Sequence, residues 1–448
     1  MKHLIFAIGF LLNLCALVKG ENDELKKAVP KGFVTTRGTE FELDGSSFAF
    51  VGANSYWLPL LTTKDDVEST FSQMQEAGVK VLRTWGFNAI NASELPGALE
   101  SGLTYYQVWN NGDWTLNDGP QGLERLDTVI NVAAKYDIRV ILALTNNWVG
   151  YGGMELYVDH IDPGASTHDI FYTDSRMIAS YQRYVKTIVN RYKDSSTIFA
   201  WEMMNEARCL GDLPQSAACS AASKTVPNWY KQQSDFIRSL DPNHMITTGG
   251  EGAFLYSCFV AYLIRLHLGH LFLKTKNPTL ATDYNFDGQA GEDFSFDLTL
   301  PNVDFGTYHM YPQTWYPQLD FPGSNFSVEG WGLFWMDAHV NAANAAGKPL
   351  ILEEFGVTGL ANKTEIYPKW VQFALDTKHA IMPWQFGASG LKEDSGNRLI
   401  KYADALIDGA SPNDGFAIYK NQTVWNVFAY EESNSSCRLI VNTFQKCC

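Results

Sequence analysis

The sequence is poor in positive charge. Its 448 residues include 34 Lys and Arg against 49 Asp and Glu, a formal net charge of -15, and the basic residues form no cluster. Because a protein that recognises nucleic-acid phosphates needs a surplus of Lys and Arg on some face, this composition argues against a nucleic-acid-binding protein. We therefore expect a neutral partner.

Cysteine is also scarce, and its spacing matches no zinc site. Of the seven cysteines, Cys15 lies in an apolar N-terminal segment, while Cys209 and Cys219 bracket a loop that contains Gly211 and Pro214. We expect a local disulfide between these two in an oxidising compartment. The cysteines that the sequence does not pair are Cys258, Cys437, Cys447 and Cys448.

Several common sequence features are missing as well. No Gly-rich phosphate-binding fingerprint follows the first predicted strand, which argues against a nucleotide-binding protein. The chain has no internal repeat and no linker rich in Ser, Thr and Pro. A second folded domain is therefore not expected.

Aromatic residues, by contrast, are abundant, with 13 Trp and 21 Tyr in a chain that is 46% apolar. This apolar content is enough to bury one large core or two ordinary ones, and we expect most of the rings to lie there. Flat amphipathic rings also suit a neutral, ring-shaped ligand such as a sugar. They cover its C–H face while their N–H and O–H groups bond its hydroxyls.

Residues 1–20 have the pattern of a cleaved secretory signal, because Lys2 precedes an apolar run and Gly20 precedes the polar Glu21. We expect a secreted, extracellular protein that starts near Glu21 and does not span a membrane after signal cleavage. Two or three of its Asn-x-Ser/Thr triplets are expected to carry a glycan. These triplets begin at Asn91, Asn325, Asn362, Asn421 and Asn434.

From about residue 33, short apolar runs rich in β-branched residues alternate with amphipathic stretches, which is typical of repeated βα units. The predicted strands are Phe48–Ala53, Val79–Thr84, Val140–Leu144, Ile198–Met203, Met245–Thr248, Asp304–Thr307, Leu350–Glu353 and Ala380–Trp384. The predicted helices include Lys64–Ala77, Gly122–Lys135, Ser175–Tyr192, Asn228–Leu240, Leu333–Ala346 and Thr364–Thr377. Eight strands in such alternation favour an α/β fold, a (β/α)8 TIM barrel, over a doubly wound sheet.

In such a barrel the chemistry lies at the C-terminal ends of the strands. The residues to consider there are Asn54, Arg83, Asn146, Asn147, Asn205, Glu206, Glu251, His309, Tyr311, Glu353, Glu354 and Trp384. Carboxylates that end the fourth and seventh strands stand across the barrel mouth from each other. One carboxyl that protonates a leaving oxygen and another that attacks an anomeric carbon suit glycoside hydrolysis. On residue types alone, buried structural ion pairs are an equal alternative.

Five runs have a distinctive sequence: Val81–Asn88, Asn146–Trp148 with Tyr151–Met154, Phe199–Cys209, Tyr308–Pro312 and Leu352–Gly356. They resemble glycoside hydrolase family 5, most closely its fungal endo-β-1,4-mannanases. They occur in the family's order within a likeness that extends from about Gly32 to about Tyr419. The resemblance implies a single catalytic domain over residues 21–430, followed by an unassigned tail at 431–448.

The resemblance assigns catalytic roles to individual residues. Glu206 matches the acid/base and Glu354 the nucleophile. Arg83 resembles the arginine that keeps the nucleophile ionised, since an opposite charge lowers a carboxyl pKa. Tyr311 resembles the tyrosine that bonds the nucleophile, and His309 resembles the histidine beside the acid/base.

Other matched residues would bind the substrate. Asn205 resembles the asparagine that bonds the sugar 2-hydroxyl, Trp384 the tryptophan under the reacting ring, and Arg208 a contact on the leaving-group side. Weaker candidates for the subsites are Trp57, Asn147, Trp148 and Tyr151. The implied mechanism retains stereochemistry, needs carboxyls about 5 to 5.5 Å apart, and uses no metal or cofactor.

Strand geometry adds two expectations. Neighbours on a strand point to opposite faces, so only one of Glu353 and Glu354 should enter the barrel, and the resemblance selects Glu354. By the same argument, Asn205 and Glu206 can both act only if the fourth strand ends or bulges there.

The chain departs from the family pattern at three places. Ala207 stands where the family usually has proline, and we expect little effect. Residues from about 256 to 282 form an atypical insert, which we interpret as a retained intron or another gene-model error. The tail at 431–448 lacks the glycine and aromatic pattern of a fungal cellulose-binding module and is open to the same interpretation.

The sequence therefore predicts a secreted, monomeric, retaining endo-β-1,4-mannanase whose partner is a β-mannan polysaccharide. An endo-β-1,4-glucanase or other β-glycanase of the same family is the nearest alternative, because mannose and glucose differ in the orientation of one hydroxyl. A non-catalytic carbohydrate-binding protein is the alternative from another class.

Overall fold

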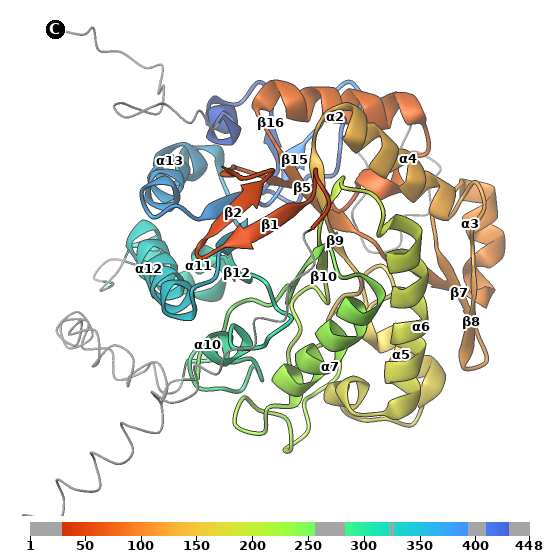
Figure 1. Ribbon diagram of the computed structural model, residues 1–448. Helices are drawn as coiled ribbons and strands as arrows, with labels where there is room; N and C mark the ends of the chain where they lie inside the picture. Colours follow the sequence, from red (N-terminus) through yellow and green to blue (C-terminus); the bar gives the residue numbers. More distant parts are fainter. Residues whose placement is uncertain (1–28, 256–282, 322–323, 325–326, 393–408, 430–448) are drawn as a thin grey trace, which may run out of the picture. The chain divides into compact units, whose positions relative to one another are not determined.

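The computed structural model describes residues 29–255, 283–321, 324, 327–392 and 409–429 (Figure 1). The predicted signal at 1–20, the predicted insert at 256–282 and the predicted tail at 431–448 lie outside these residues. The chain divides into two compact units, Met1–Lys31 and Gly32–Cys448, and every element named below belongs to the second.

Parallel strands form the centre of this unit. The first sheet has five strands in the order β11-β10-β9-β5-β4, and the second has three in the order β12-β13-β14. Their bounds are β4 Ala53–Asn54, β5 Val81–Trp85, β9 Arg139–Ala143, β10 Ile198–Glu202, β11 Met245–Thr247, β12 Gly306–Met310, β13 Leu350–Phe355 and β14 Ala380–Pro383. Each of the eight overlaps one of the predicted strands.

Backbone hydrogen bonds join the two sheets at both ends. Asp304 N–H donates to the carbonyl of Ile246 at 2.9 Å, beside β12 and β11. Gly52 N–H donates to the carbonyl of Ile381 at 3.0 Å, and Val51 pairs with the same residue in a parallel bridge. The strands therefore follow one another in chain order around a ring, as a (β/α)8 barrel requires.

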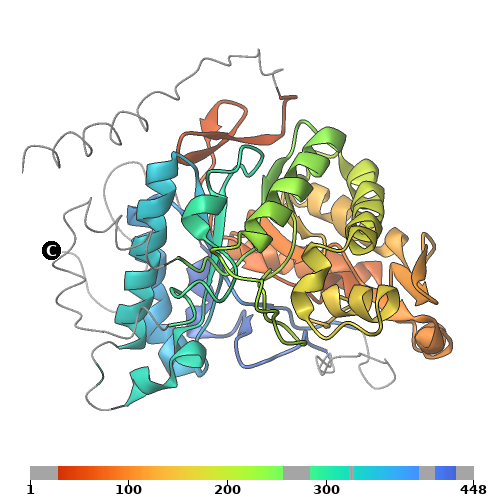
Figure 2. The ribbon, with the colours of Figure 1, turned by 90° about the horizontal axis from the view of Figure 1, so that it is seen from below.

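Six long helices lie outside the strands (Figures 1 and 2). They are α2 Lys64–Ala77, α4 Leu123–Lys135, α6 Ser175–Tyr192, α7 Thr225–Leu240, α12 Val328–Ala346 and α13 Leu360–Asp376. Helix α2 shows why the local sequence sets such bounds: the Thr63 side chain accepts from Asp66 N–H at its start, and Gly78 ends it at φ 92°. Helices α7, α12 and α13 begin three to five residues before the predicted starts.

The remaining elements decorate this barrel. The other strands are β1 Val34–Arg37, β2 Glu40–Leu43, β3 Ser46–Ser47, β6 Ala89–Asn91, β7 Gln107–Asn110, β8 Asp113–Leu116, β15 Phe386–Gly387 and β16 Ile418–Tyr419. The short helices are η1 Leu58–Leu60, η2 Ala92–Glu94, α3 Leu95–Ser101, α5 Met154–Ile161, η3 His168–Tyr172, α10 Phe294–Asp297, α11 Pro312–Trp315, η5 Pro317–Asp320 and η7 Thr423–Phe428.

The N-terminal end of the barrel is closed by the antiparallel strands β1, β2 and β3. Phe41 of β2 packs its ring against Phe199 and Phe305, with centroids 5.1 and 5.2 Å away. These rings belong to a buried cluster with residues at the starts of the parallel strands, such as Val81 and Ile351. Apolar side chains fill the barrel interior at this end, and in a (β/α)8 barrel the active site lies at the opposite end, where the parallel strands have their C-termini.

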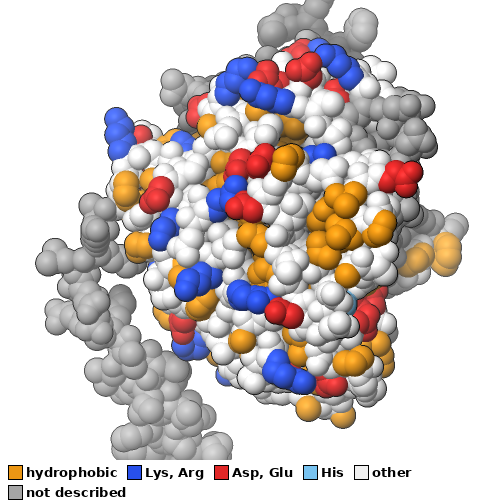
Figure 3. All heavy atoms as spheres, turned by 90° about the vertical axis from the view of Figure 1, so that its right-hand side faces the viewer, with side chains coloured by type: hydrophobic (Ala, Val, Ile, Leu, Met, Phe, Trp, Pro, Cys, Tyr) orange, Lys and Arg blue, Asp and Glu red, His pale blue; other side chains and the backbone are white. Residues whose placement is uncertain are grey.

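The surface over β7, β8 and α6 carries acidic and basic side chains next to each other (Figure 3). Two of the ion pairs on this surface join Arg183 to Asp113 and Arg176 to Asp174. The predicted disulfide between Cys209 and Cys219 is present, which confirms that pairing. Within the described ranges, no helix combines the length and apolar character needed to cross a membrane.

The chain segments on the two sides of the predicted insert are already in contact. Phe254 N–H donates to the carbonyl of Asn285 at 2.8 Å, and Leu255 pairs with Asp287 in an antiparallel bridge. The Phe254 ring also stacks on Phe286 at 6.1 Å. The described residues on the two sides of the insert therefore meet each other directly.

We predict that deleting residues 256–282 leaves the fold intact, because the flanking segments meet without them and a shorter loop costs less entropy to close. Thermal unfolding should stay cooperative. The melting temperature should be higher than that of the full chain or no more than about 4 °C below it. A variant with Gly-Gly in place of the insert controls for strain at the new junction. Loss of cooperative unfolding in both variants would contradict the prediction.

Candidate active site

A cavity of ≈ 340 Å³ opens at the C-terminal ends of the parallel strands. Its walls come from segments far apart in the sequence. The lining residues are Tyr56, Trp85, Asn146, Trp148, Gly150, Tyr151, Asn205, Glu206, Tyr311, Glu354, Trp384 and Asp414. Seven of these were selected by the sequence analysis: Trp148, Tyr151, Asn205, Glu206, Tyr311, Glu354 and Trp384. Asn146 was also among the strand-end residues.

Arg83, on β5, lies under this cavity and is fully buried. Its Nε and Nη2 donate to the two oxygens of Glu202, each at 2.7 Å, in a bidentate pair. Nη1 donates to Glu354 Oε1 and, at 3.2 Å, to Asn54 Oδ1, while Nη2 also reaches Asn205 Oδ1 at 2.7 Å. One guanidinium therefore fixes side chains from β4, β10, β13 and the segment after β10.

Glu206 and Asn205 both face the cavity because β10 ends at Glu202, before either residue. Glu206 has a φ of 54°, in the left-handed region that non-glycine residues rarely adopt. Its backbone N–H donates to the carbonyl of Gly249 at 2.7 Å, and Asn205 N–H donates to that of Thr145 at 3.0 Å. The expectation that the fourth strand ends here agrees with the structure.

The expectation that only one of Glu353 and Glu354 enters the barrel is wrong. Between β12 and β13 the register shifts, so that Tyr308 pairs with Leu352 but His309 pairs with Glu354. Glu353 is the extra residue of this irregularity, which breaks the alternation of the strand. Its carboxylate lies inside, 3.6 Å from Arg83 Nε and 3.7 Å from His309 Nε2.

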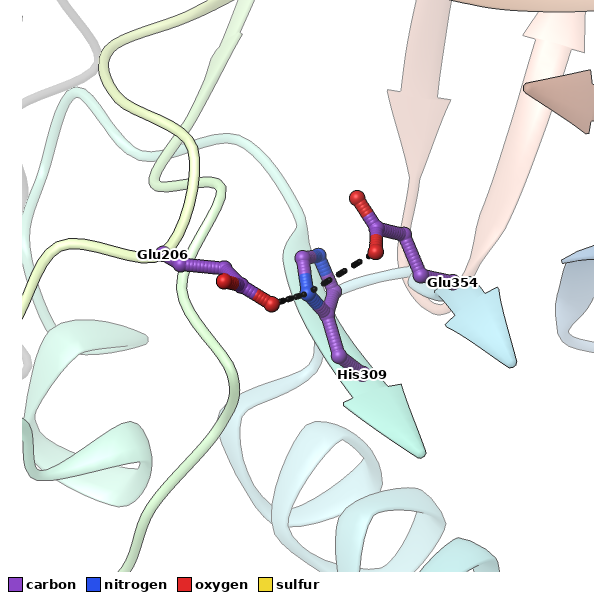
Figure 4. A group of neighbouring side chains, drawn as sticks. All are labelled: Glu206, His309 and Glu354. Carbon is purple, nitrogen blue, oxygen red and sulfur yellow. Dashed lines mark hydrogen bonds and ion pairs between the residues drawn. The ribbon is translucent and has the colours of Figure 1, made fainter. Parts of the chain in front are cut away.

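The imidazole of His309 lies between the carboxylates of Glu206 and Glu354 (Figure 4). Nδ1 is 2.9 Å from Glu206 Oε1 and 3.5 Å from Glu354 Oε2. Burial by itself lowers the pKa of His309. The charge of Glu354, the hydrogen bond with Glu206, the Glu353 carboxylate nearby and the charge of Glu206 outweigh burial, so the pKa is raised well above its usual value. The surrounding carboxylates therefore favour the protonated imidazole.

The environment of Glu206 is cationic. Trp148 Nε1–H donates to Oε2 at 2.6 Å, and Arg208 Nη2 is 3.7 Å from the same oxygen. Burial raises the pKa of Glu206, but the hydrogen bond and charge of His309, then the charge of Arg208 and the Trp148 bond, lower it to about 2. The neighbours of Glu206 and His309 therefore favour the pair in which the imidazole carries the proton.

Glu354 has different neighbours. Besides the Arg83 bond to Oε1, the Tyr311 hydroxyl donates to Oε2 at 2.7 Å. The two donors hold the carboxylate in one orientation at the cavity wall. One ligand-type atom from each of Glu206, His309 and Glu354 lies within 4.8 Å of the others, a spacing that three metal ligands also have. The carboxylates favour a protonated imidazole, which offers no lone pair at that nitrogen, so the group fits proton sharing better than metal binding.

Arg208 and Trp384 border the site on two sides. The Arg208 guanidinium lies over the Trp148 ring at 4.6 Å and pairs with Glu251 at 2.7 Å. Trp384 stacks on Tyr56, with centroids 5.3 Å apart and planes 7° from parallel. Aromatic faces and a cation thus flank the carboxylates.

Two weaker sequence candidates do not line the cavity. Trp57 is fully buried in the core, and the ring that faces the site belongs to its neighbour Tyr56. Asn147 is also buried, where its Oδ1 accepts from Arg208 N–H at 3.2 Å and contacts His168 Nε2 at 3.0 Å. This amide supports the segment that carries Arg208. Both assignments to subsites are therefore corrected.

The sequence analysis missed five residues at the site: Tyr56, Trp85, Gly150 and Asp414, which line the cavity, and Glu202, which binds Arg83. Trp85 and Glu202 stand inside the runs that carry the family resemblance, so their positions at strand ends were available as a signal. Asp414 lies in a turn-like Asn-Asp-Gly stretch, which predicts a loop and gives no indication of a site.

Comparison with known proteins agrees with this geometry. The family profile described as Cellulase (glycosyl hydrolase family 5) matches residues 35–390. Mannan endo-1,4-beta-mannosidase F of Aspergillus clavatus is 36% identical over 397 residues, covering 88% of this chain and 76% of that protein. Mannan endo-1,4-beta-mannosidase A of Aspergillus aculeatus is 34% identical over 423 residues, covering 94% of each.

Solved structures show the same relationship. The endo-1,4-beta-mannanase of Rhizomucor miehei superposes with a TM-score of 0.70 at 32% identity, over 88% of this chain and 97% of that one. The endo-beta-1,4-mannanase of Thermotoga petrophila gives a TM-score of 0.68 at 29% identity, over 86% and 76%. Together with the ring of parallel strands, these similarities confirm the predicted (β/α)8 barrel.

We predict that Arg83→Lys lowers the free energy of unfolding by about 3–5 kcal/mol, because a lysine cannot satisfy Glu202, Glu354 and Asn205 together and leaves buried charge unpaired. Urea unfolding followed by tryptophan fluorescence measures the change. Arg37→Lys is the matched control, since the Arg37 side chain is 65% exposed. Equal stability of the two variants would contradict the prediction.

A second prediction concerns pH. Burial raises the pKa of Glu292 to about 7, although it accepts N–H bonds from Ala253 and Gly252. The folded state therefore binds more protons than the unfolded state between pH 4.5 and 7, and stability is lost as the pH rises through this window. Glu292→Gln should remove this loss. Between pH 4.5 and 8 its free energy of unfolding should therefore rise by about 3 kcal/mol relative to that of the parent.

Urea unfolding of the parent and of Glu292→Gln at both pH values measures this difference. Glu365→Gln, on the exposed side of α13, controls for the loss of one carboxylate. An unchanged gap between parent and variant at the two pH values would show that Glu292 does not titrate in this window.

Proposed function

Because the chain belongs to glycosyl hydrolase family 5, we propose that it is a secreted endo-β-1,4-mannanase. It cleaves internal β-1,4-mannosidic bonds of mannan, galactomannan and glucomannan with retention of configuration. The observation that carries this proposal is the pair Glu206 and Glu354, which have oxygens within 4.8 Å of each other and unlike neighbours. Retaining glycosidases have carboxyls about 5 to 5.5 Å apart, whereas inverting enzymes leave about 6.5 to 9.5 Å for a water.

Glu354 is the proposed nucleophile. Arg83 and Tyr311 each donate to one of its oxygens, so its orientation toward the cavity is set before the substrate arrives. Attack on the anomeric carbon forms a covalent glycosyl-enzyme as the glycosidic bond breaks. Asn205, held by Arg83 and by the Asn146 amide oxygen at 2.9 Å, is placed to bond the sugar 2-hydroxyl.

Glu206 is the proposed acid/base. It shares one proton with His309 across a 2.9 Å contact, and this pair titrates as a unit. As negative charge develops on the leaving oxygen, Glu206 passes it the proton that His309 supplies. Glu206 then accepts a proton from the water that hydrolyses the glycosyl-enzyme, which returns the pair to its starting state.

The substrate assignment rests on the relatives, whose names specify mannan endo-1,4-beta-mannosidases. The parts of the cavity on either side of the two carboxylates suit a polysaccharide, because the flat rings of Trp384 and Trp148 can pack against sugar rings. Secretion is supported by the N-terminal signal pattern and by the disulfide between Cys209 and Cys219, which needs an oxidising compartment. Parallel assays on mannan and cellulose test the alternative of an endoglucanase.

We predict that Glu206→Gln and Glu354→Gln each reduce the release of reducing ends from galactomannan by at least about 100-fold, the usual contribution of a positioned acid or nucleophile. Melting temperatures of the variants establish that both fold. Glu365→Gln is the matched control and should keep full activity.

An aryl mannoside with a good leaving group separates the two roles, because its departure needs no proton. Glu206→Gln should then still form the glycosyl-enzyme, seen as a burst of phenolate, and Glu354→Gln should not. NMR of the first product formed should show the β-anomer. Binding of mannan by a folded parent without turnover would instead favour the non-catalytic carbohydrate-binding protein.

A further inference from the structure

The carboxylate of Asp414 lines the cavity, although it belongs to none of the parallel strands. Its Oδ2 accepts the indole N–H of Trp384 at 2.7 Å and the amide N–H of Gln385 at 3.1 Å. Its Oδ1 accepts the backbone N–H of Phe416 at 3.0 Å. The indole N–H of a tryptophan is its only hydrogen-bond donor, so Asp414 fixes the one polar contact that can orient this ring.

The segment that carries Asp414 is itself fastened to the barrel. Strand β16 pairs in parallel with β15, and Ile418 N–H donates to the carbonyl of Gln385 at 2.9 Å. From α13, the buried Lys363 ammonium donates to the carbonyl of Ala417 at 3.1 Å. Asp414 is thus exposed to solvent at the cavity rim but held on a defined backbone.

The same segment also reaches the proposed nucleophile. The Phe416 ring meets the Tyr311 ring edge-on at 5.5 Å, and Tyr311 donates to Glu354. A Cβ at Gly356 would lie 2.5 Å from Phe416, so the chain next to Glu354 is shaped to admit this ring. Residues 414 and 416 therefore contact two side chains that line the cavity, Trp384 and Tyr311.

We propose that Asp414 is a positioning residue for hydrolysis, which sets the plane of Trp384 beneath the reacting sugar through the indole N–H. This inference rests on the proposed function. Stacking on Tyr56 leaves the indole free to slide and turn within the stack, and the carboxylate removes that freedom. Because the reacting ring changes shape on the way to an oxocarbenium-like transition state, a fixed platform favours the transition state over the ground state.

The first test compares Asp414→Ala with Asp414→Asn. The asparagine keeps an acceptor for the indole N–H, whereas the alanine removes it. We expect Asp414→Ala to lower kcat on galactomannan by about 10-fold to 100-fold with a smaller change in KM, the usual effect of misplacing a positioned group. Asp414→Asn should recover most of this loss.

Asn413→Ala is the matched control, because Asn413 is exposed in the same loop and, among the described residues, its side chain accepts a local bond alone, from Gly415 N–H at 2.9 Å. It loosens the loop without touching Trp384 and should keep kcat within about twofold. If Asn413→Ala and Asp414→Ala lowered kcat and melting temperature alike, Asp414 would be only a structural part of the loop, and the proposal would be overturned.

A double-mutant cycle with Trp384→Phe isolates the route of the effect. Phenylalanine has no N–H, so in this background Asp414→Ala should change kcat by less than about twofold, since coupled residues are not additive. Full additivity of the two losses would show that Asp414 does not act through Trp384 and would overturn the proposal.

A readout independent of activity is the indole N–H resonance of Trp384 in ¹⁵N-Trp-labelled protein, identified by its absence in Trp384→Phe. In Asp414→Ala this resonance should move upfield and exchange faster with solvent, and in Asp414→Asn it should stay close to the parent. If the parent were inactive on mannan but these shifts appeared, the proposed function would fail while the contact with Trp384 stood. An unchanged resonance in Asp414→Ala would overturn the inference whatever the activity.

Discussion

The buried charge of Arg83 is the constraint on which the site depends. A guanidinium stays protonated in proteins, so its burial is tolerable only if anions and acceptors surround it. Glu202 supplies a bidentate partner and Glu354 a second carboxylate, while the amide oxygens of Asn54 and Asn205 also accept from the guanidinium. Each of these side chains comes from a different place in the barrel, and the requirement of one cation brings them to one point.

This arrangement divides the work between the carboxylates. Glu202 takes up two of the Arg83 donors in the interior, which leaves Glu354 at the cavity wall with one guanidinium bond and the Tyr311 hydroxyl. Glu206, on the other side, has His309, Trp148 and Arg208 around it. The two groups that face the substrate therefore differ in their cations and donors. In the proposed mechanism the proton donor is therefore the pair of Glu206 and His309, whereas Glu354 acts as the nucleophile.

The aromatic walls add a second level of organisation. Tyr56 and Trp384 form a stack whose outer ring has its N–H tied to Asp414, and Trp148 is capped by the Arg208 guanidinium. In each case a charged group fixes a flat ring. Because the interaction of a sugar with such a ring has little directionality of its own, the orientation has to come from the protein side.

The sequence by itself determined the eight strands, most of the helices, and the order of the residues that form the site. These features are local: apolar runs, helical periodicity and strand-end polar residues are written along the chain. It could not determine which side of β13 Glu353 faces, because a register shift against β12 overrides the alternation of the strand. It also could not place Trp57, Asn147 or Asp414. Their positions depend on contacts between distant segments, such as the 30 residues that separate Trp384 from Asp414 or the 271 that separate Arg83 from Glu354. Only the closed barrel brings such partners together, and burial and hydrogen bonding then decide which side chains reach the cavity.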